Sequence, residues 1–371
     1  MSFGRAVALA VERIVDPVEG MHRAISGRWF SALGDAGKRA KRAHDAVAHG
    51  IYQAVRMGGT ALGVGIDYGA TVRQSTFDRT QALVNGLWGD TLGRYEERLG
   101  IPMSLRDRDG AMLTVGPPLD TSSVTSHLVV LVHGFIDTEH CWTGSQTDPG
   151  LLDALESHPS LTPLQVRYNT GQPVSVSGAE LANLIETVSG DWPAPIESIA
   201  LVGHSMGGLV IRSACAAATE NGHDWITVVT DVVALGAPHL GAPLEKLTEL
   251  AARGLVVAKE TRPLARFLDS RSRGIKDLRH GTIHAGDWSH LDPVALPTEI
   301  DHHFVAGVVT AEPTHPAGIV MGDLIVRTRS ATGADYLDPT NVMVVGGVRH
   351  SDLVRDPAVV NRVMGWLDPV S

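Results

Sequence analysis

The sequence has two cysteines, few aromatic residues and no long uninterrupted apolar run. Cys141 and Cys215 are too few for the disulfide framework that small secreted domains use in place of a large core. The apolar runs are shorter than the roughly 20 residues that a transmembrane helix needs. The start of the chain also lacks the long apolar stretch and the cleavage site of a secretory signal. We therefore expect a cytoplasmic protein without a membrane-spanning helix.

Net positive charge is also missing. The 371 residues carry 31 Lys and Arg against 41 Asp and Glu, which gives a net charge of −10. Residues 101–371 carry the whole excess, with a balance of −13, whereas residues 1–100 have a balance of +3. The acidic part argues against nucleic acid as a partner, because phosphate backbones are bound by Lys and Arg. The mildly basic first part fits either peripheral contact with an anionic membrane or a solvated helix face.

Two parts of the chain differ in pattern. Residues 1–100 show helical spacing of apolar residues, with helices expected over 36–57 and 81–98, and we interpret them as an N-terminal helical extension. This extension could cover one side of the domain that follows, form a homo-oligomer contact or lie on a membrane surface. From residue 101 onward, strands alternate with helices, which indicates an α/β fold with a mostly parallel sheet. A long insertion over residues 241–300 is expected to act as a cap or lid.

The expected strands are continuous apolar runs, as strands buried on both faces of a sheet should be. They are predicted over residues 128–132, 163–167, 198–202, 227–235, 303–309 and 341–345. Helices are predicted over residues 178–188, 244–261 and 352–367. This order of elements predicts one α/β domain over residues 101–371, with helices on its flanks.

The most informative segment is Gly203-His204-Ser205-Met206-Gly207, a G-x-S-x-G sequence between an expected strand and an expected helix. A serine on such a tight turn has strained backbone angles, and small residues two positions to either side avoid a clash. The turn lifts the hydroxyl out of the sheet and aims the N-terminus of the next helix at the reaction centre. The segment predicts Ser205 as a nucleophile supported by Gly203 and Gly207. We expect the side chain of His204 to point away from this elbow.

A serine hydroxyl needs a general base, and the base needs an orienting acid. In the order that suits this fold, the histidine follows the last strand, where His350 stands just before the final helix. The acid should follow the penultimate strand, where Asp323 follows a glycine and precedes an apolar pair. We predict Asp323 as the acid. The competing aspartates lie before a strand, at the start of a strand or in a polar loop: Asp301, Asp231, Asp335 and Asp338.

An oxyanion hole needs two backbone N–H groups aimed at the oxygen that becomes negative. One is expected from Met206, directly after the nucleophile. The other is expected from the loop after the strand over 128–132, which reads His133-Gly134-Phe135-Ile136, and we assign it to Phe135. Within this loop, we expect Gly134 to support the geometry. We expect His133 to act as a structural hydrogen-bonding residue and not as a second base.

With these residues in place, the chain resembles the α/β-hydrolase superfamily, and within it the bacterial lipases and esterases similar to GPI inositol-deacylase-like lipases. The matching segments follow one another in the family's order: His133–Phe135, Arg167–Gly171, Gly203–Gly208, Leu235–Pro243, Gly322–Val326 and His350 before Leu353–Pro357. The resemblance implies hydrolysis of a carboxylic ester through an acyl-enzyme, with no metal and no organic cofactor. The family often has a second glycine after the acid, where this chain has Leu324.

The leading hypothesis is a serine hydrolase of lipid-like or medium-chain esters, with a small-molecule or lipid ester as its partner. The same triad could act on a thioester, an amide or a polyester, because the chemistry is shared. A different class of function is a membrane-associated scaffold that works through residues 1–100, with a vestigial hydrolase core. A dinucleotide-binding enzyme does not fit, because the glycines around Ser205 do not form G-x-G-x-x-G with an acidic residue at the next strand end.

Overall fold

The computed structural model describes residues 100–114, 124–145, 147–242, 272–284, 297–334 and 336–369, with isolated positions between residues 53 and 89. Most of the predicted extension, the helix expected over 244–261 and much of the predicted cap lie outside the described residues. The described positions between 78 and 89 are all helical, in or next to the helix expected over 81–98. Among the helices that are described, none combines the length and apolar character that a bilayer crossing requires.

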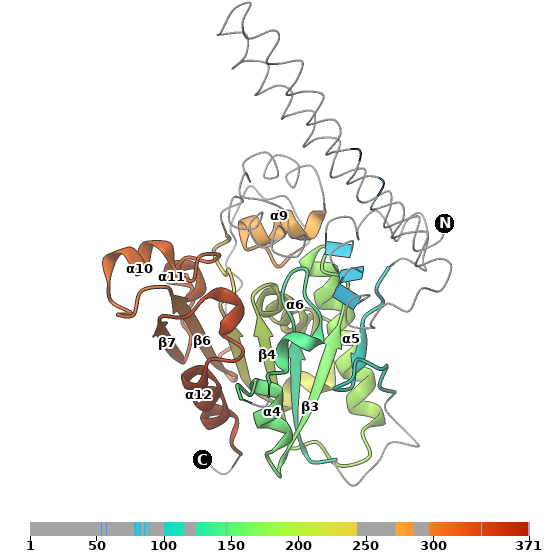
Figure 1. The fold of residues 1–371 in the computed structure, drawn as a ribbon. Coiled ribbons are helices and arrows are strands. Elements are labelled where there is room, and N and C mark those ends of the chain that lie inside the picture. The colour runs from blue at the N-terminus through green and yellow to red at the C-terminus, as the bar shows by residue number, and fades with distance from the viewer. Residues whose placement is uncertain are drawn as a thin grey trace, which may run out of the picture.

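A seven-stranded sheet forms the centre of the described structure (Figure 1). Its strands are β1 (Ser104–Arg106), β2 (His127–Val132), β3 (Leu161–Arg167), β4 (Ser198–His204), β5 (Val229–Leu235), β6 (Asp301–Val308) and β7 (Asn341–Gly346). Their spatial order is β1-β3-β2-β4-β5-β6-β7. Strand β1 pairs antiparallel with β3, and the other neighbours in this sheet are parallel. The predicted α/β fold class with a mostly parallel sheet is confirmed.

All six predicted strands are present, with ends that differ by a few residues from the prediction. Strand β3 begins two residues before the predicted start, at Leu161, and β5 begins two residues later, at Val229. The late start of β5 follows from a 3₁₀ helix, η4 (Asp224–Val228), which takes up the first residues of the apolar run. Strand β1 was not predicted, because three residues carry too little alternation to be distinguished from a loop.

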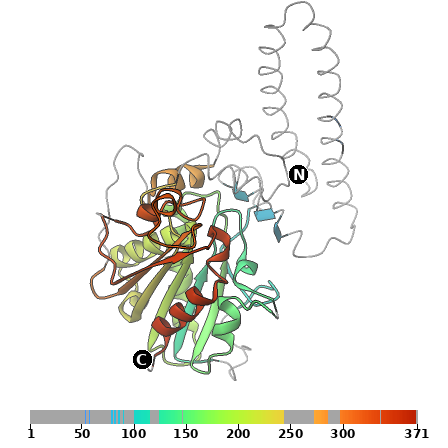
Figure 2. The same ribbon diagram turned by 60° about the vertical axis from the view of Figure 1, so that its left-hand side comes forward.

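Helices cover both faces of the sheet (Figures 1 and 2). On one face lie α5 (Val174–Asp191) and α6 (Met206–Asn221), and on the other lie α4 (Leu151–Glu156) and α12 (Pro357–Leu367). Near the ends of the strands lie shorter helices: η3 (Glu139–Trp142), α9 (Arg273–His280), α10 (Pro316–Met321), α11 (Thr328–Ala331) and η5 (His350–Asp352). The closing helix begins at Pro357, five residues later than predicted, because Asp356 caps it by accepting hydrogen bonds from two backbone N–H groups.

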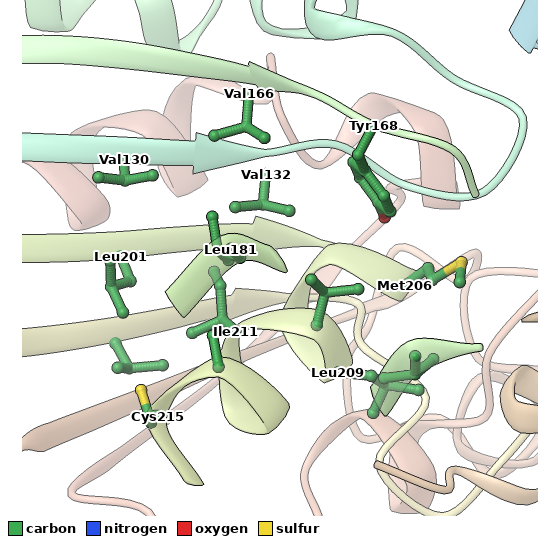
Figure 3. Close-up of a cluster of buried hydrophobic side chains, with 14 of the residues drawn as sticks. Val130, Val132, Val166, Tyr168, Leu181, Leu201, Met206, Leu209, Ile211 and Cys215 are labelled. Carbon is green, nitrogen blue, oxygen red and sulfur yellow. The ribbon is translucent and has the colours of Figure 1, made fainter. Parts of the chain in front are cut away.

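The core consists of two apolar layers, one on each face of the sheet. Alternate residues of β2 point to opposite faces, so that Val130 and Val132 pack on the side of α5 and α6 (Figure 3). Val129 and Leu131 pack on the other side, with α4 and α12. Each large apolar side chain that is fully buried contributes about 1.5–3 kcal/mol through removal from water. The two layers together fix the sheet on which the site is built.

The chain reverses its direction across the sheet at β2. It first moves from β2 to β3 on one side, and it then crosses back over β2 to β4 on the other side. Val132, the last residue of β2, pairs with Gly203 near the end of β4. The loops that follow these two strands therefore lie side by side. In open parallel sheets, ligands bind at such a reversal, beyond the carboxyl ends of the strands.

Candidate active site

Ser205 lies on a strained turn between β4 and α6. Its backbone has φ 53° and ψ −119°, a conformation that side-chain-bearing residues rarely adopt and that costs about 1–3 kcal/mol. The turn is held by a hydrogen bond of 2.8 Å from the Ser205 N–H to the carbonyl of Leu235, at the end of β5. The sequence-based prediction placed a serine at such a turn, and the strain is present there.

The two glycines of the elbow stand where no side chain fits. A Cβ on Gly203 would lie 2.5 Å from the backbone nitrogen of Gly208. A Cβ on Gly207 would lie 2.0 Å from the carbonyl oxygen of Val132, in the neighbouring strand. Since backbone atoms cannot move aside as a flexible side chain can, both positions require glycine if α6 is to start directly beside β2.

His350 and Asp323 form a buried hydrogen-bonded pair. Asp323 follows α10, and His350 begins η5 after the last strand. Nδ1 of His350 lies 2.7 Å from Oδ2 of Asp323. The other carboxylate oxygen accepts hydrogen bonds from the N–H groups of Ile325 at 2.9 Å and Val326 at 2.8 Å. Both side chains are buried, with exposed fractions of 1% for Asp323 and 2% for His350.

These contacts keep Asp323 ionised. Burial alone would raise the pKa of its carboxyl group, but the His350 ring and the two backbone N–H donors hold the pKa below its ordinary value. An ionised carboxylate accepts hydrogen bonds and does not donate them, so the His350 Nδ1 must carry the proton. In the neutral ring, Nε2 is then the basic nitrogen. It is buried and has no hydrogen-bond partner among the described residues.

The nucleophile elbow and the His350 ring meet at the end of β5. Leu235 accepts the hydrogen bond from Ser205, and the next residue, Gly236, contacts the ring. A Cβ on Gly236 would lie 3.2 Å from both Nδ1 and Cε1 of His350, and its φ of 61° also favours glycine. No hydrogen bond joins Ser205 to Nε2 of His350 in the described structure. Catalytic hydrogen bonds of this kind are often long without substrate and tighten when it binds.

His204 lies against His350, a contact that the expectation of a side chain pointing away from the elbow did not include. Its Nε2 lies 3.0 Å from the carbonyl oxygen of His350, and the two ring centroids are 4.9 Å apart. Burial, and then the neighbouring His350, lower the pKa of His204 to about 3. His204 is therefore neutral, and its Nε2–H donates to that carbonyl. This contact anchors the backbone of His350 to the strand that carries the nucleophile.

The loop between β2 and η3, residues 133–138 (hereafter the β2–η3 loop), lies against the elbow. A Cβ on Gly134 would be 3.0 Å from the Cβ of Ser205, so glycine lets this backbone approach the nucleophile. The N–H of Ile136 donates to Oγ1 of Thr170 at 3.2 Å, and that of Asp137 donates to the carbonyl of Gly134 at 3.3 Å. The described hydrogen bonds include none from the N–H of Phe135.

Met206 is the first residue of α6, so its N–H has no carbonyl partner within the helix. The N-terminus of α6 also carries the positive end of the helix dipole. Met206, at the start of α6, and Phe135, in the β2–η3 loop, are the two residues from which the oxyanion hole is predicted.

His133 makes the contacts of a structural residue. Its Nδ1 lies 2.9 Å from the carbonyl oxygen of Gly134, and its ring stacks on Tyr168 with centroids 4.6 Å apart. The hydroxyl of Tyr168 donates to the carbonyl of His133 at 2.9 Å. Burial lowers the pKa of His133, so the ring is neutral. These contacts fit the predicted structural role.

Residues 122–265 match a protein family described as "Putative serine esterase (DUF676)". The match covers β2 to β5 with the elbow, and these strands are neighbours in the parallel part of the sheet. The family match and the mostly parallel sheet agree with the α/β-hydrolase fold expected from the sequence.

Solved structures that this chain resembles include the naproxen esterase (carboxylesterase NP) of Bacillus subtilis, with 15% identity over 68% of this chain and 86% of that chain, and a TM-score of 0.39. Another is the RedJ thioesterase of the prodiginine biosynthetic pathway in Streptomyces coelicolor, with 15% identity over 69% and 95%, and a TM-score of 0.39. A third is an alpha/beta hydrolase fold protein from Chitinophaga pinensis, with 16% identity over 72% and 98%, and a TM-score of 0.39. A search of curated proteins finds no match.

Several residues that shape the candidate site were not given a role from the sequence. Tyr168 and Thr170 hold the β2–η3 loop, and Gly236 contacts His350. The sequence contained a signal for these residues, because Tyr168 and Thr170 lie in the segment Arg167–Gly171 and Gly236 lies in Leu235–Pro243. Both segments were among those that carried the resemblance to the family. The match gives no role to single residues, because their hydrogen bonds reach loops from other parts of the chain.

One group of side chains near the site has the composition of a metal centre. Asp78, Glu139 and His140 offer ligand atoms within 4.8 Å of one another. However, the guanidinium of Arg167 binds both carboxylates, through Nη1 to Asp78 at 3.1 Å and through Nε to Glu139 at 2.7 Å. Burial alone would lower the pKa of Arg167, but the Glu139 and Asp78 carboxylates raise it above its ordinary value. The group is thus a buried ion-pair network with a permanent cation in its centre.

Proposed function

We propose that this protein is an α/β hydrolase that cleaves carboxylic esters with a Ser205–His350–Asp323 triad, through an acyl-enzyme intermediate. The observation that carries the proposal is the buried His350–Asp323 pair, whose basic nitrogen has no partner beside the strained elbow of Ser205. The match to a family described as serine esterases supports the reaction class. The substrates proposed are lipid-like or medium-chain acyl esters.

The first half of the reaction forms the acyl-enzyme. Nε2 of His350 takes the proton of the Ser205 hydroxyl while the serine oxygen attacks the ester carbonyl. Asp323 keeps the ring in the correct tautomer and stabilises the imidazolium, at close range and out of water. The N–H groups of Phe135 and Met206 bind the carbonyl oxygen as it becomes negative. When the tetrahedral intermediate collapses, the bond to the alcohol breaks and His350 returns the proton to that alcohol.

The second half releases the acid. His350, neutral again, takes a proton from a water molecule that attacks the acyl carbonyl of Ser205. The same two N–H groups bind the second oxyanion. Collapse then breaks the bond to the serine oxygen, and His350 gives that oxygen its proton back. The products are one carboxylic acid and one alcohol, with the enzyme unchanged.

The test is hydrolysis of p-nitrophenyl esters from acetate to palmitate by the wild type and by the Ser205→Ala variant. Turnover by the wild type and a loss of about 10⁴-fold or more in the variant are expected, because removal of the nucleophile leaves only binding and oxyanion contacts. Ser198→Ala is the matched control, since Ser198 lies at the other end of the same strand and bonds to His127. The chain-length profile separates an esterase from a lipase.

Thioester, amide and polyester substrates are offered in the same assay, because the triad acts on each of them by the same steps. Wild-type activity on one of these and not on p-nitrophenyl esters would move the proposal to that substrate class. No activity on any of them, from folded protein, would favour a scaffold that works through residues 1–100. Full activity of Ser205→Ala on an ester would contradict the proposed nucleophile.

A further inference from the structure

The described residues between positions 78 and 89 of the predicted extension (hereafter the stretch 78–89) are helical, and Gly86 among them packs onto the β2–η3 loop. In this stretch Asp78, Ala82 and Asn85 are buried, with exposed fractions of 2%, 2% and 0%. These residues follow one another at spacings of four and three, so they share one face of a helix. In Figure 1 the stretch appears as short blue pieces of ribbon. Its buried face is turned toward the site.

Glycines allow the backbones of this stretch and of the site to touch. A Cβ on Gly86 would lie 2.7 Å from Cγ1 of Ile136 and 3.3 Å from Cε2 of Phe135, the residue whose N–H is assigned to the oxyanion hole. A Cβ on Gly171, in the loop after β3, would lie 2.0 Å from the carbonyl oxygen of Asn85. The stretch is therefore in direct contact with the loop that shapes the oxyanion hole.

Hydrogen bonds fix the stretch in this position. The hydroxyl of Ser272, which caps α9, donates to the carbonyl of Gly86 at 2.8 Å. Oδ1 of Asn85 accepts from the N–H of Ile101 at 3.1 Å, inside the protein. The stretch is thus tied to α9 on one side and to the start of the catalytic domain on the other.

An ion-pair network connects the same stretch to the end of the β2–η3 loop. Arg167 binds Asp78 with both terminal nitrogens, at 3.1 and 3.0 Å. It also binds Glu139, the first residue of η3, through Nε and Nη2. All three side chains are buried. Paired contacts from both sides hold the planar guanidinium in one orientation, so Asp78 helps to determine where Glu139 and the loop before it lie.

The β2–η3 loop needs such support. Ile136 has a φ of 61°, which is an outlier for a β-branched residue. A conformation of this kind persists only where the surroundings determine it. Thr170 fixes the N–H of Ile136, Gly86 packs on its side chain, and the network fixes Glu139 three residues later. Loss of one support would let the loop relax and would turn the neighbouring peptide group.

We propose that the stretch 78–89 is a working part of the active site, in which Asp78 and Gly86 are positioning residues for the oxyanion loop. The functional unit then extends beyond the catalytic domain expected from residue 101. The inference rests on the proposed function, because it assigns the task of the stretch to the oxyanion hole of that reaction. Neither residue touches the substrate. Gly86 acts through Phe135 and Ile136, and Asp78 acts through Arg167 and Glu139.

The test uses the full-length variants Gly86→Ala and Asp78→Asn. Alanine favours the helix more than glycine does, so a loss of activity in Gly86→Ala cannot be attributed to a weaker helix. Gly365→Ala, in α12, is its matched control, because a Cβ there meets nothing within 4 Å. Arg108→Gln is the control for Asp78→Asn, because Arg108 also joins two carboxylates, Asp153 and Glu156, but on the surface.

Two properties are measured: kcat and KM for a p-nitrophenyl ester, and hydrogen exchange of the backbone amides in the peptide over residues 133–142. In both test variants we expect kcat to fall about 10-fold or more with KM within about twofold, since complete loss of one oxyanion donor costs about 10²–10³-fold in kcat. Exchange should become faster in that peptide. The two control variants should behave as the wild type does.

The proposal is overturned if folded Gly86→Ala has the same kcat and the same amide exchange as the wild type. It is also overturned if the control variants lose as much activity as the test variants. If Asp78→Asn does not fold, Gly86→Ala decides alone. If the wild type cleaves no ester, the proposed function fails, but exchange at residues 133–142 still decides whether the stretch 78–89 positions the loop.

Discussion

Asp323→Asn is the substitution that separates the role of the acid from the stability of the fold. In the wild type, one carboxylate oxygen accepts from two backbone N–H groups and the other accepts from His350. Asparagine can keep its oxygen toward Ile325 and Val326. Its NH₂ group then faces Nδ1 of His350, which must become an acceptor. The proton of the neutral ring moves to Nε2, the nitrogen that has to receive the proton of Ser205.

The expected loss is therefore large in activity and small in stability. A histidine held in the wrong tautomer cannot act as the base, and the corresponding change in serine proteases lowers kcat by roughly 10⁴-fold, or about 5 kcal/mol in the activation free energy. The backbone hydrogen bonds of the loop survive, and one neutral hydrogen bond replaces a charged one. We expect the free energy of unfolding to fall by about 1–2 kcal/mol or less.

The assay is kcat/KM on a p-nitrophenyl ester, together with urea unfolding of the same preparations. Asp231→Asn is the matched control, because Asp231 forms a similar pair with His303 at 2.9 Å. Asp231 lies four residues before Leu235 on β5, roughly 13 Å back along the strand from the site. Asp231→Asn should retain activity. Folded Asp323→Asn with activity within tenfold of the wild type would refute Asp323 as the orienting acid.

Three further predictions follow from individual contacts. Gly207→Ala should abolish activity and lower the free energy of unfolding by about 3 kcal/mol or more, because its Cβ would lie 2.0 Å from the carbonyl oxygen of Val132; normal unfolding and activity would contradict this geometry. Tyr168→Phe should lower the free energy of unfolding by about 1 kcal/mol and reduce kcat more than it changes KM, because the variant loses the hydrogen bond to the carbonyl of His133. Unchanged urea unfolding of this variant would contradict the prediction. The folded-state pKa of His204, about 3, lies below its ordinary value of 6.5, so unfolding takes up a proton at acid pH. The free energy of unfolding should therefore fall as the pH is lowered from about 6.5 toward 3, by up to about 1.4 kcal/mol per pH unit from this group. Urea unfolding at several pH values measures this dependence. The prediction is contradicted if His204→Asn leaves the pH dependence of the unfolding free energy unchanged.

Much of the fold could be predicted because its signals are local. Each buried parallel strand is a short apolar run, and the run before Gly203 ends in an elbow whose glycines are required by backbone contacts. Element ends were less predictable, because they depend on caps. Asp356 starts α12 at Pro357, although the apolar spacing of that helix extends further back.

The site was predictable only as far as chain order and motifs specify it. Ser205, Asp323 and His350 follow in the order that suits this fold, and the structure brings Asp323 and His350 into contact. The position of His204 was not predictable, because its partner is the carbonyl of a residue 146 positions away. The Asp78–Arg167–Glu139 network also escapes sequence patterns, since Asp78 and Arg167 are 89 positions apart.

The most direct test of the central claim is to locate the adduct of a fluorophosphonate probe by peptide mass spectrometry. A probe of this type reacts with a serine that an adjacent base activates and an oxyanion hole supports. We expect a single adduct on Ser205, formed together with the loss of ester hydrolysis, and slowed strongly in His350→Ala. An adduct on another residue, or none in protein that hydrolyses esters, would contradict Ser205 as the nucleophile.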